Sequence, residues 1–201
     1  METYYSSIFN EVFGPIMIGT SSSHTAGPYR IGSIARMLLG ETVKKARIAF
    51  DPDSSYASYY KLQWSDRGFT AGLFGGKIDT EDMTDAMEIA KERGMEIEFV
   101  KEPQEDKHAD YAYMELEGIN GDKMTLDTKS TGGAAIEIVG IDGFPILIKG
   151  DLNAAFFYLN GNVDREAFEA QVKNVITEKF RVKESEADGV KMYYLETRQF
   201  L

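Results

Sequence analysis

Four short segments in the middle of the chain limit its fold most strongly, because they predict consecutive antiparallel strands. Tyr111–Glu117 and Lys123–Asp127 flank the link Gly118–Asp122, whose sequence GINGD is typical of a β-hairpin connection. Ala134–Val139 and Phe144–Lys149 form a second pair around Ile-Asp-Gly. This region therefore predicts an antiparallel sheet built from hairpins.

Helical periodicity occupies other parts of the chain. After Pro28 the apolar residues recur at helical spacing up to Gly40, which stands where a C-terminal cap is expected. A second helix is predicted to begin at a Thr80 cap and to end at Gly94. With the hairpins, these helices predict an α+β fold, with helices packed on a mixed or antiparallel sheet. The remaining expected elements are a short helix over 4–13 and strands over Lys45–Phe50 and Glu96–Val100, whereas Asp51–Trp64 has no clear pattern.

The end of the chain has a different organisation. Ala154–Leu159 and Val190–Glu196 predict strands, and Asp164–Lys179 predicts an amphipathic helix between them. This β-α-β unit indicates a small second part, so we expect one domain over 1–149 and an extension over 150–201.

Composition excludes several classes of function. The 201 residues include 22 Lys and Arg against 33 Asp and Glu, a net charge of -11, which disfavours nucleic acid and anionic membranes as partners. There is no cysteine, so no disulfide and no cysteine-bound cluster can form within this chain. The sequence has neither a signal-peptide pattern nor a run of about 18 apolar residues. We therefore expect a soluble, cytoplasmic protein.

The stretch GTSSSHTAGPYRIG, at Gly19–Gly32, is the most unusual local feature. Pro28 fits the first turn of the following helix, which places the serine segment (Ser21–Thr25) at a helix N-terminus. Free backbone N–H groups and hydroxyls there suit a carboxylate or phosphate, although the lysine of a nucleotide-binding P-loop is missing. His24 suggests a base beside serine nucleophiles, but the sequence identifies no third partner. A turn whose hydroxyls simply cap the helix explains the residues equally well.

Two further features allow both a structural and a functional interpretation. His108 lies in a charged segment, where a single histidine is usually solvated. The pair Gly132 and Gly133 precedes a strand, so it predicts either a tight bend or a close approach of the backbone to a ligand.

A longer stretch of sequence around the serine segment favours the functional interpretation. FGPIMIGTSSSHTAGPYRIG resembles the signature IGPSSSHTxGPxxxG of the β chain, or N-terminal domain, of iron–sulfur-dependent L-serine dehydratases, with Thr20 in place of a proline. HAD at His108 resembles the family's HPN segment, and STGGAAIEI at Ser130 resembles its serine, glycine triplet and strand. The resemblance implies catalytic roles for His24 and His108, and substrate binding by Ser21, Ser22, Ser23, Thr25, Gly27, Asp66, Ser130, Gly132 and Gly133.

The resemblance also implies a division of labour between chains. In the family, cysteines of an α chain or C-terminal domain bind a 4Fe-4S cluster, whose open iron assists loss of the substrate hydroxyl as serine becomes pyruvate and ammonia. This chain would supply substrate contacts to that partner in a homo- or hetero-oligomer, would bind a small amino acid, and would be inactive alone. The implied fold is similar to the allosteric substrate-binding domain of some phosphoglycerate dehydrogenases, and the extension would be a reduced or truncated ACT-like module.

One family segment departs in this chain. The family's GHGTD corresponds best to Leu62–Asp66, where Gln63 replaces the histidine and Leu62 and Trp64 replace glycines. Because glutamine cannot shuttle protons near neutral pH, an alternative is a catalytically degenerate module that binds an amino acid or anion for regulation. A purely structural interaction domain gives the serine segment no task.

Overall fold

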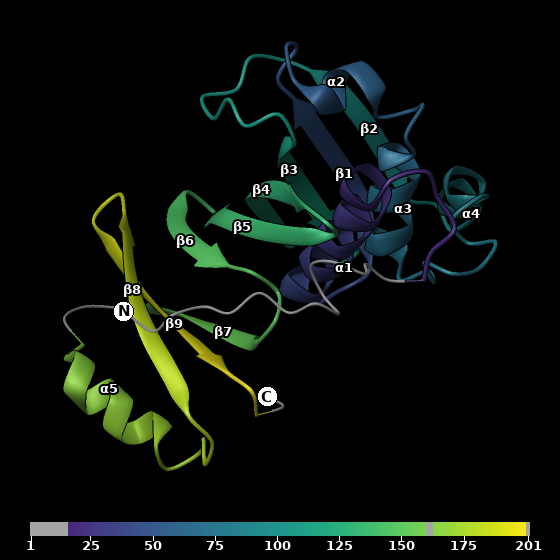
Figure 1. Ribbon diagram of the computed structural model, residues 1–201. Helices are drawn as coiled ribbons and strands as arrows, with labels where there is room; N and C mark the ends of the chain where they lie inside the picture. Colours follow the sequence, from purple (N-terminus) through teal and green to yellow (C-terminus); the bar gives the residue numbers. More distant parts are fainter. Residues whose placement is uncertain (1–15, 160–162, 200–201) are drawn as a thin grey trace.

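The computed structural model describes residues 16–159 and 163–199, and within them the fold is α+β (Figure 1). The helix expected over 4–13 lies outside the described residues. The predicted hairpins are confirmed. They belong to a six-stranded sheet in the order β2-β1-β3-β4-β5-β6, in which β1 and β2 are parallel and all other neighbours antiparallel. The strands are β1 (Val43–Phe50), β2 (Glu96–Lys101), β3 (Tyr111–Gly118), β4 (Lys123–Gly132), β5 (Ala135–Ile141) and β6 (Phe144–Ile148).

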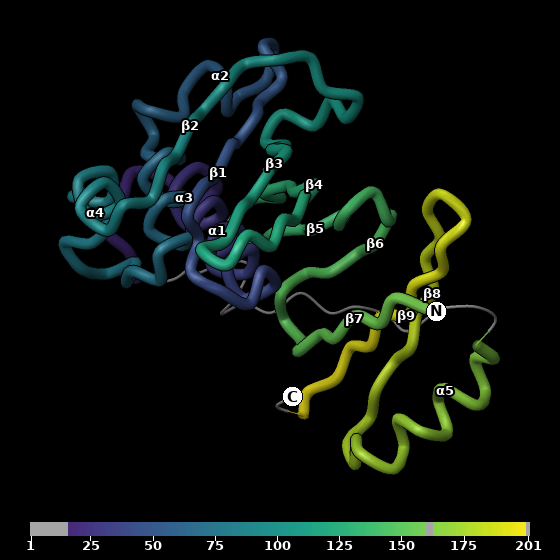
Figure 2. The backbone as a smooth tube through the Cα atoms, turned by 180° about the vertical axis from the view of Figure 1, so that it is seen from behind, coloured from purple at the N-terminus to yellow at the C-terminus, as the bar shows by residue number. Residues whose placement is uncertain are grey.

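Two helices, α1 (Gly27–Leu39) and α3 (Ser65–Phe74), lie side by side on one face of this sheet (Figures 1 and 2). They pack closely because glycines face each other. A Cβ atom on Gly72 would lie 2.3 Å from the carbonyl oxygen of Tyr29, and one on Gly32 would lie 2.5 Å from that of Phe69. The Ala-Gly-Leu stretch around Gly72 therefore serves helix packing, and this contact holds the start of α1 in place.

The sequence predicted α1 and its cap at Gly40 correctly, but the other helices of this part differ. The helix expected from Thr80 begins only at Ala86, where α4 (Ala86–Glu92) follows a series of turns. The unassigned region before α3 contains the short helix α2 (Ser55–Tyr59), capped by the Ser54 side chain.

A second sheet of three strands has the order β7-β9-β8, and α5 (Arg165–Val172) covers one of its faces. Its strands are β7 (Asn153–Leu159), β8 (Phe180–Ala187) and β9 (Val190–Thr197). The helix predicted over Asp164–Lys179 is shorter in the structure. It ends at Val172, and Val175 beyond it is 71% exposed. The sequence also missed β8, so the unit is β-α-β-β.

The two sheets share apolar contacts. Met192 and Tyr194 of β9 belong to the same buried cluster as the core of the six-stranded sheet. Ser185 of β8 donates a hydrogen bond of 2.7 Å to the carbonyl oxygen of Pro145 in β6. The division into 1–149 and 150–201 stays a prediction.

Candidate active site

The serine segment folds as a helical turn that joins α1 directly. Ser22–Ala26 forms a π-helix, η2, which runs into α1 at Gly27. Ser21 is its N-cap, and the Ser21 side chain accepts a hydrogen bond of 3.2 Å from the N–H of His24. The helix therefore starts one turn earlier than Pro28 suggested. The N–H groups of Ser22 and Ser23 belong to the first turn, where no intrahelical acceptor is available.

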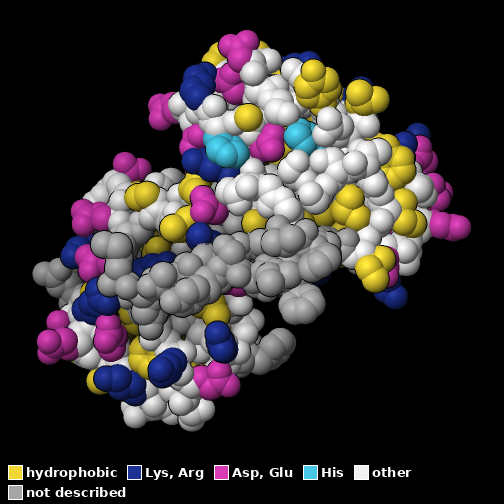
Figure 3. Space-filling view, viewed as in Figure 1, with side chains coloured by type: hydrophobic (Ala, Val, Ile, Leu, Met, Phe, Trp, Pro, Cys, Tyr) yellow, Lys and Arg dark blue, Asp and Glu magenta, His cyan; other side chains and the backbone are white. Residues whose placement is uncertain are grey.

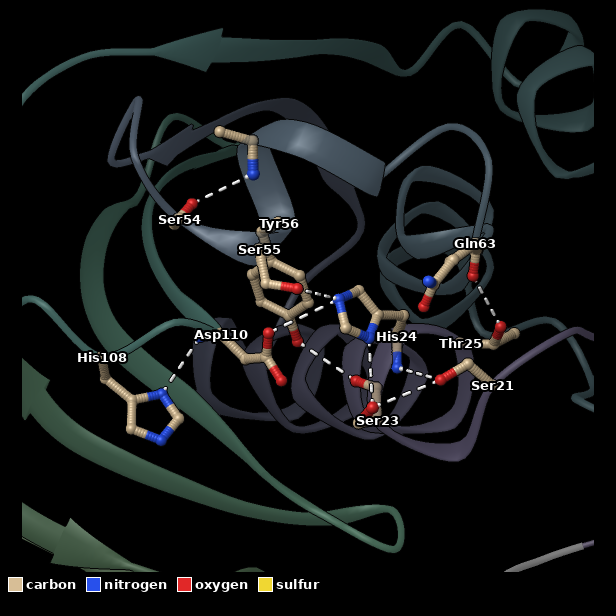
Figure 4. A network of polar contacts seen from close by, with 11 residues as sticks. Ser21, Ser23, His24, Thr25, Ser54, Ser55, Tyr56, Gln63, His108 and Asp110 are labelled. Carbon is tan, nitrogen blue, oxygen red and sulfur yellow. Dashed lines mark hydrogen bonds and ion pairs between the residues drawn. The ribbon is translucent and has the colours of Figure 1, made fainter.

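His24 is the centre of a polar network (Figure 4). Its side chain is 10% exposed, and its ring makes a T-shaped contact with the ring of Tyr56, with centroids 5.3 Å apart. Nδ1 lies 3.1 Å from Oγ of Ser23, and Nε2 lies 2.8 Å from Oγ of Ser55 and 3.5 Å from Oδ1 of Asp110. The partners that the sequence could not identify are thus Ser55 and Asp110.

Backbone hydrogen bonds bring these remote parts of the chain together. Ser55 N donates to the carbonyl of Ala109 at 2.9 Å, and Ser130 N donates to the carbonyl of Asp110 at 3.0 Å. Asp110 N donates to Nδ1 of His108 at 3.1 Å. His108 therefore faces the backbone of Asp110, and among the described residues it makes no hydrogen bond or ion pair with His24. Asp110 lies between the two histidines, since its N–H bonds to His108 and its carboxylate faces His24.

Three predicted binding residues, Thr25, Gly27 and Ser130, are buried in or beside the serine segment. Thr25 is fully buried and donates from Oγ1 to the carbonyl oxygen of Gln63 at 2.9 Å. Ser130 is 1% exposed, and a Cβ atom on Gly27 would lie 2.3 Å from its Oγ. These contacts give Thr25, Gly27 and Ser130 structural roles, whereas Ser21, Ser22 and Ser23 are partly exposed.

The glycine pair forms a hairpin turn. Gly132, Gly133 and Ala134 all have positive φ, of 98°, 61° and 68°. Positive φ at both central residues is the requirement of a tight β4–β5 turn, so these residues favour the structural interpretation left open above. Arg30 of α1 donates to the carbonyl oxygen of Ala134 at 2.7 Å, which fixes the turn against the helix.

Leu62–Asp66, the segment that differs from the family pattern, lies at the start of α3. Trp64 is its N-cap with a φ of 62°, a left-handed conformation that favours glycine, so backbone geometry accounts for the family's glycine at this position. The guanidinium carbon of Arg67 lies 4.3 Å from the centre of the Trp64 ring. Asp66 accepts from the N–H of Arg67 at 2.8 Å, and burial raises the pKa of its carboxyl group.

Electrostatics single out Asp110 within the network. Burial raises the pKa of Asp110, and the charges of His24 and His108 oppose that rise. Burial, together with the charge of Asp110, also raises the pKa of the fully buried Tyr56 well above its ordinary value, so this phenol stays neutral.

The network lies just beneath one face of the molecule, where Figure 3 shows both histidines. Two hollows of the surface lie away from this network. One of about 700 Å³ lies over the charged outer face of β1–β4, and one of about 490 Å³ lies at the C-terminal end of α1. Among the described residues, no group of three or more His, Cys, Asp and Glu side chains is placed to hold a metal ion. No helix in the same part of the chain is long and apolar enough to cross a membrane.

Two curated proteins are similar to the chain over most of its length. The probable L-serine dehydratase, beta chain, of Bacillus subtilis (strain 168) is 34% identical over 172 residues, which cover 86% of this chain and 75% of that protein. The L-serine dehydratase, beta chain, of Peptoniphilus asaccharolyticus is 31% identical over 150 residues, covering 74% and 66%. No protein-family model matches the sequence.

The fold and the histidine network define an α+β protein with a polar site at a helix start. The similarity to these two proteins shows, more narrowly, that the chain belongs to the family of L-serine dehydratase beta chains.

Sequence reasoning missed Ser55, Tyr56 and Asp110. Asp110 stood in the HAD segment, at the place of the asparagine in the family's HPN, which was the available signal. Ser55 and Tyr56 lay in the region without a pattern, and only the fold places them against His24.

Proposed function

We propose that this chain is the β-type component of an iron–sulfur L-serine dehydratase, a lyase that converts L-serine to pyruvate and ammonia. The observation that carries the proposal is the position of His24 at the first turn of a helix, between Ser23 and the pair Ser55 and Asp110. Membership of the beta-chain family supports the same activity.

The residues of the serine segment have distinct tasks in this proposal. The first-turn N–H groups and hydroxyls of Ser22 and Ser23 bind the carboxylate of the amino acid, as helix N-termini bind anions. His24 accepts or returns a proton at Nδ1, the ring nitrogen that faces Ser23. Ser21 orders the turn through its cap to the N–H of His24.

The donors of this chain do not fit an iron–sulfur cluster, because such clusters need thiolates and the sequence contains no cysteine. The proposal therefore assigns the 4Fe-4S cluster to an α-type chain or domain. Both relatives are named beta chains, which favours a partner of that kind. The partly exposed serine segment gives such a partner access to the site.

Two structural proposals accompany this function. Residues 1–149 would share the fold of the allosteric substrate-binding domain of some phosphoglycerate dehydrogenases. Residues 150–201 would be a reduced ACT-like module, since the observed β-α-β-β order corresponds to the first four elements of the βαββαβ order of an ACT domain. An oligomer in the cytoplasm is the setting we propose for both.

Reconstitution tests the activity. We expect no ammonia release from the purified chain, and release after anaerobic mixing with iron and a cysteine-bearing α-type partner. His24→Ala should abolish the reconstituted activity, while Ser58→Ala, on the exposed end of α2, should keep it. Activity of the chain alone without iron, or an active His24→Ala complex, contradicts the proposal.

A regulatory binding module is the second candidate, and Gln63 and Trp64 favour it because they replace a histidine and a glycine of the family pattern. Such a module would bind an amino acid or anion at the serine segment but would not catalyse the release of ammonia from serine. Calorimetry with L-serine and sulfate tests the site itself. Ser22→Ala removes only the hydroxyl, whereas Ser22→Pro removes the N–H at a position where proline fits the start of a helix and follows the extended Ser21.

Weaker binding in Ser22→Pro than in Ser22→Ala is the expected result for a backbone anion site. Unchanged binding in both variants contradicts the site. A complex that binds serine normally but releases no ammonia favours the regulatory module over the enzyme component.

A further inference from the structure

The proposed function assigns no separate role to the carboxylate of Asp110. Asp110 is the residue immediately before β3, and its side chain is 15% exposed. Its Oδ1 lies 3.5 Å from Nε2 of His24, and this buried oxygen has no hydrogen-bond partner among the described residues. A desolvated carboxylate oxygen without a donor is costly, so a nearby group that can become positive would stabilise it.

The backbone aims this carboxylate at His24. The N–H of Asp110 donates to Nδ1 of His108, and its carbonyl accepts from Ser130. The hydroxyl of Ser55 lies 2.8 Å from Nε2 of His24, and its interaction with the carboxylate acts to lower the pKa of Asp110. His108, Ser130 and Ser55 thus all interact with Asp110, and Ser55 also contacts His24.

Donor and acceptor rules then select one state of the neutral His24 ring. An ionised carboxylate only accepts, so the hydroxyl of Ser55 donates to Asp110 and has a lone pair left for His24. Nε2 therefore carries the ring proton, and Nδ1 is the acceptor for the hydroxyl of Ser23. With the proton on Nδ1 instead, Nε2 and both carboxylate oxygens would compete for the single hydroxyl proton of Ser55.

We propose that Asp110 is the positioning residue for His24: through Ser55 it holds the proton of the neutral ring on Nε2, and its buried Oδ1 balances the charge when His24 takes up a proton at Nδ1. The catalytic meaning of this arrangement rests on the function proposed above. The tautomer itself is a property of the chain alone.

An asparagine at position 110 would neither hold the ring proton of His24 on Nε2 nor balance its positive charge. The amide of an asparagine at position 110, as in the HPN segment that HAD resembles, both donates and accepts and carries no charge. It can pair with either tautomer of His24, because it offers an N–H or an oxygen as needed. The other titratable groups that face this network are His108, which contacts the backbone of Asp110, and the neutral Tyr56.

NMR of the nitrogen-15-labelled chain tests the tautomer directly, because only two histidines contribute ring signals. A His108→Gln variant assigns them. At alkaline pH, we expect His24 to show a protonated Nε2 and an unprotonated Nδ1 in the native chain. In Asp110→Asn the two shifts should move toward each other as the second tautomer appears, and Ser55→Ala should produce the same change with the carboxylate retained.

Asp106→Asn is the matched control, since Asp106 lies in the same segment and accepts a hydrogen bond from the N–H of His108 but makes no hydrogen bond or ion pair with His24. Its His24 signals should equal those of the native chain, and circular dichroism should confirm that all variants fold. The proposal is overturned if native His24 carries its proton on Nδ1, or if folded Asp110→Asn leaves the His24 nitrogens unchanged.

The reconstituted complex supplies a second readout. Because Asp110 acts on His24 and not on the substrate, Asp110→Asn should lower kcat by at least about 10-fold, with KM little changed. An unchanged kcat, or a rise in KM alone, overturns the positioning role. Failure of the native complex to release ammonia would contradict the proposed function instead, and the NMR result would still decide the tautomer.

Discussion

The hydroxyl of Thr25 donates a hydrogen bond of 2.9 Å to the main-chain carbonyl oxygen of Gln63, which fastens the serine segment to the turn before α3. Because the acceptor is a backbone atom, any residue at position 63 can supply it. The replacement of the family's histidine by Gln63 therefore leaves this contact intact. What it removes is a ring that could exchange protons.

Thr25→Val should reveal the strength of this contact. Valine keeps the shape of threonine but leaves the carbonyl of Gln63 without its donor, which should cost about 1–3 kcal/mol of unfolding free energy. Urea unfolding measures the loss, and Thr25→Ser, which retains the hydroxyl, should recover most of it. Equal losses in the two variants would show that packing of the methyl group, not the hydrogen bond, is what matters.

The approach of α1 and α3 predicts a steric effect. Alanine favours helices over glycine by about 1 kcal/mol, yet Gly72→Ala should destabilise the protein because its Cβ meets backbone atoms. Gly32→Ala should do the same from the facing helix. Once one substitution has separated the helices, the second should cost less, so the double variant should lose less stability than the sum. Additive losses would argue against a shared contact.

The left-handed Trp64 predicts an inverted preference for glycine. At a φ of 62°, alanine is strained by about 1–2 kcal/mol and glycine is not. Trp64→Gly should therefore be at least as stable as Trp64→Ala. At Lys91, exposed on α4, glycine should instead be about 1 kcal/mol worse than alanine. Far-UV circular dichroism should follow unfolding, since Trp64 is the only tryptophan.

Asp51 predicts part of the acid sensitivity of the fold. Hydrogen bonds from the N–H of Gln104, the ammonium of Lys107 and the N–H of Asp53 lower its pKa from 3.8 to about 2. A lowered folded-state pKa gives stability that is present above the unfolded value and is lost as the pH falls from 3.8 to about 2. Asp51→Asn should flatten the unfolding free energy across this interval.

Lys107→Met should remove only part of that pH dependence, because the two backbone donors to Asp51 remain. Chemical unfolding at a series of pH values between about 2 and 5 makes the comparison. An Asp51→Asn variant with the slope of the native chain would contradict the contribution of this carboxylate.

The shared core predicts that the two sheets unfold together. Met192 of β9 is fully buried within the main cluster, so Met192→Ala should cost about 2–5 kcal/mol. Val190→Ala, on the exposed start of the same strand, should stay within about 0.5 kcal/mol of the native chain. Calorimetry should show one transition for each variant. Two transitions, with Met192→Ala moving only one, would instead support separate domains.

The sequence by itself determined the elements whose signals are local. The hairpin link at Gly118–Asp122 and the cap at Gly40 act within a few residues, so β3, the start of β4 and α1 were predicted correctly. β4 itself continues to Gly132, beyond the predicted end at Asp127. β8 was missed because Arg181, Lys183 and other charged residues interrupt its apolar pattern. The helix over 164–179 was drawn too long because Val175 fits a helical face that the chain does not form.

Only the tertiary structure decided how the site is assembled. His24 and its serine neighbours are recognisable in the sequence, since they form one segment at a helix start. Ser55 and Asp110 reach His24 only because backbone hydrogen bonds join α2, the loop before β3 and the end of β4. Burial then desolvates Asp110 and leaves its oxygen facing the ring. Residue spacing carries no information about such contacts, because they depend on how distant segments pack.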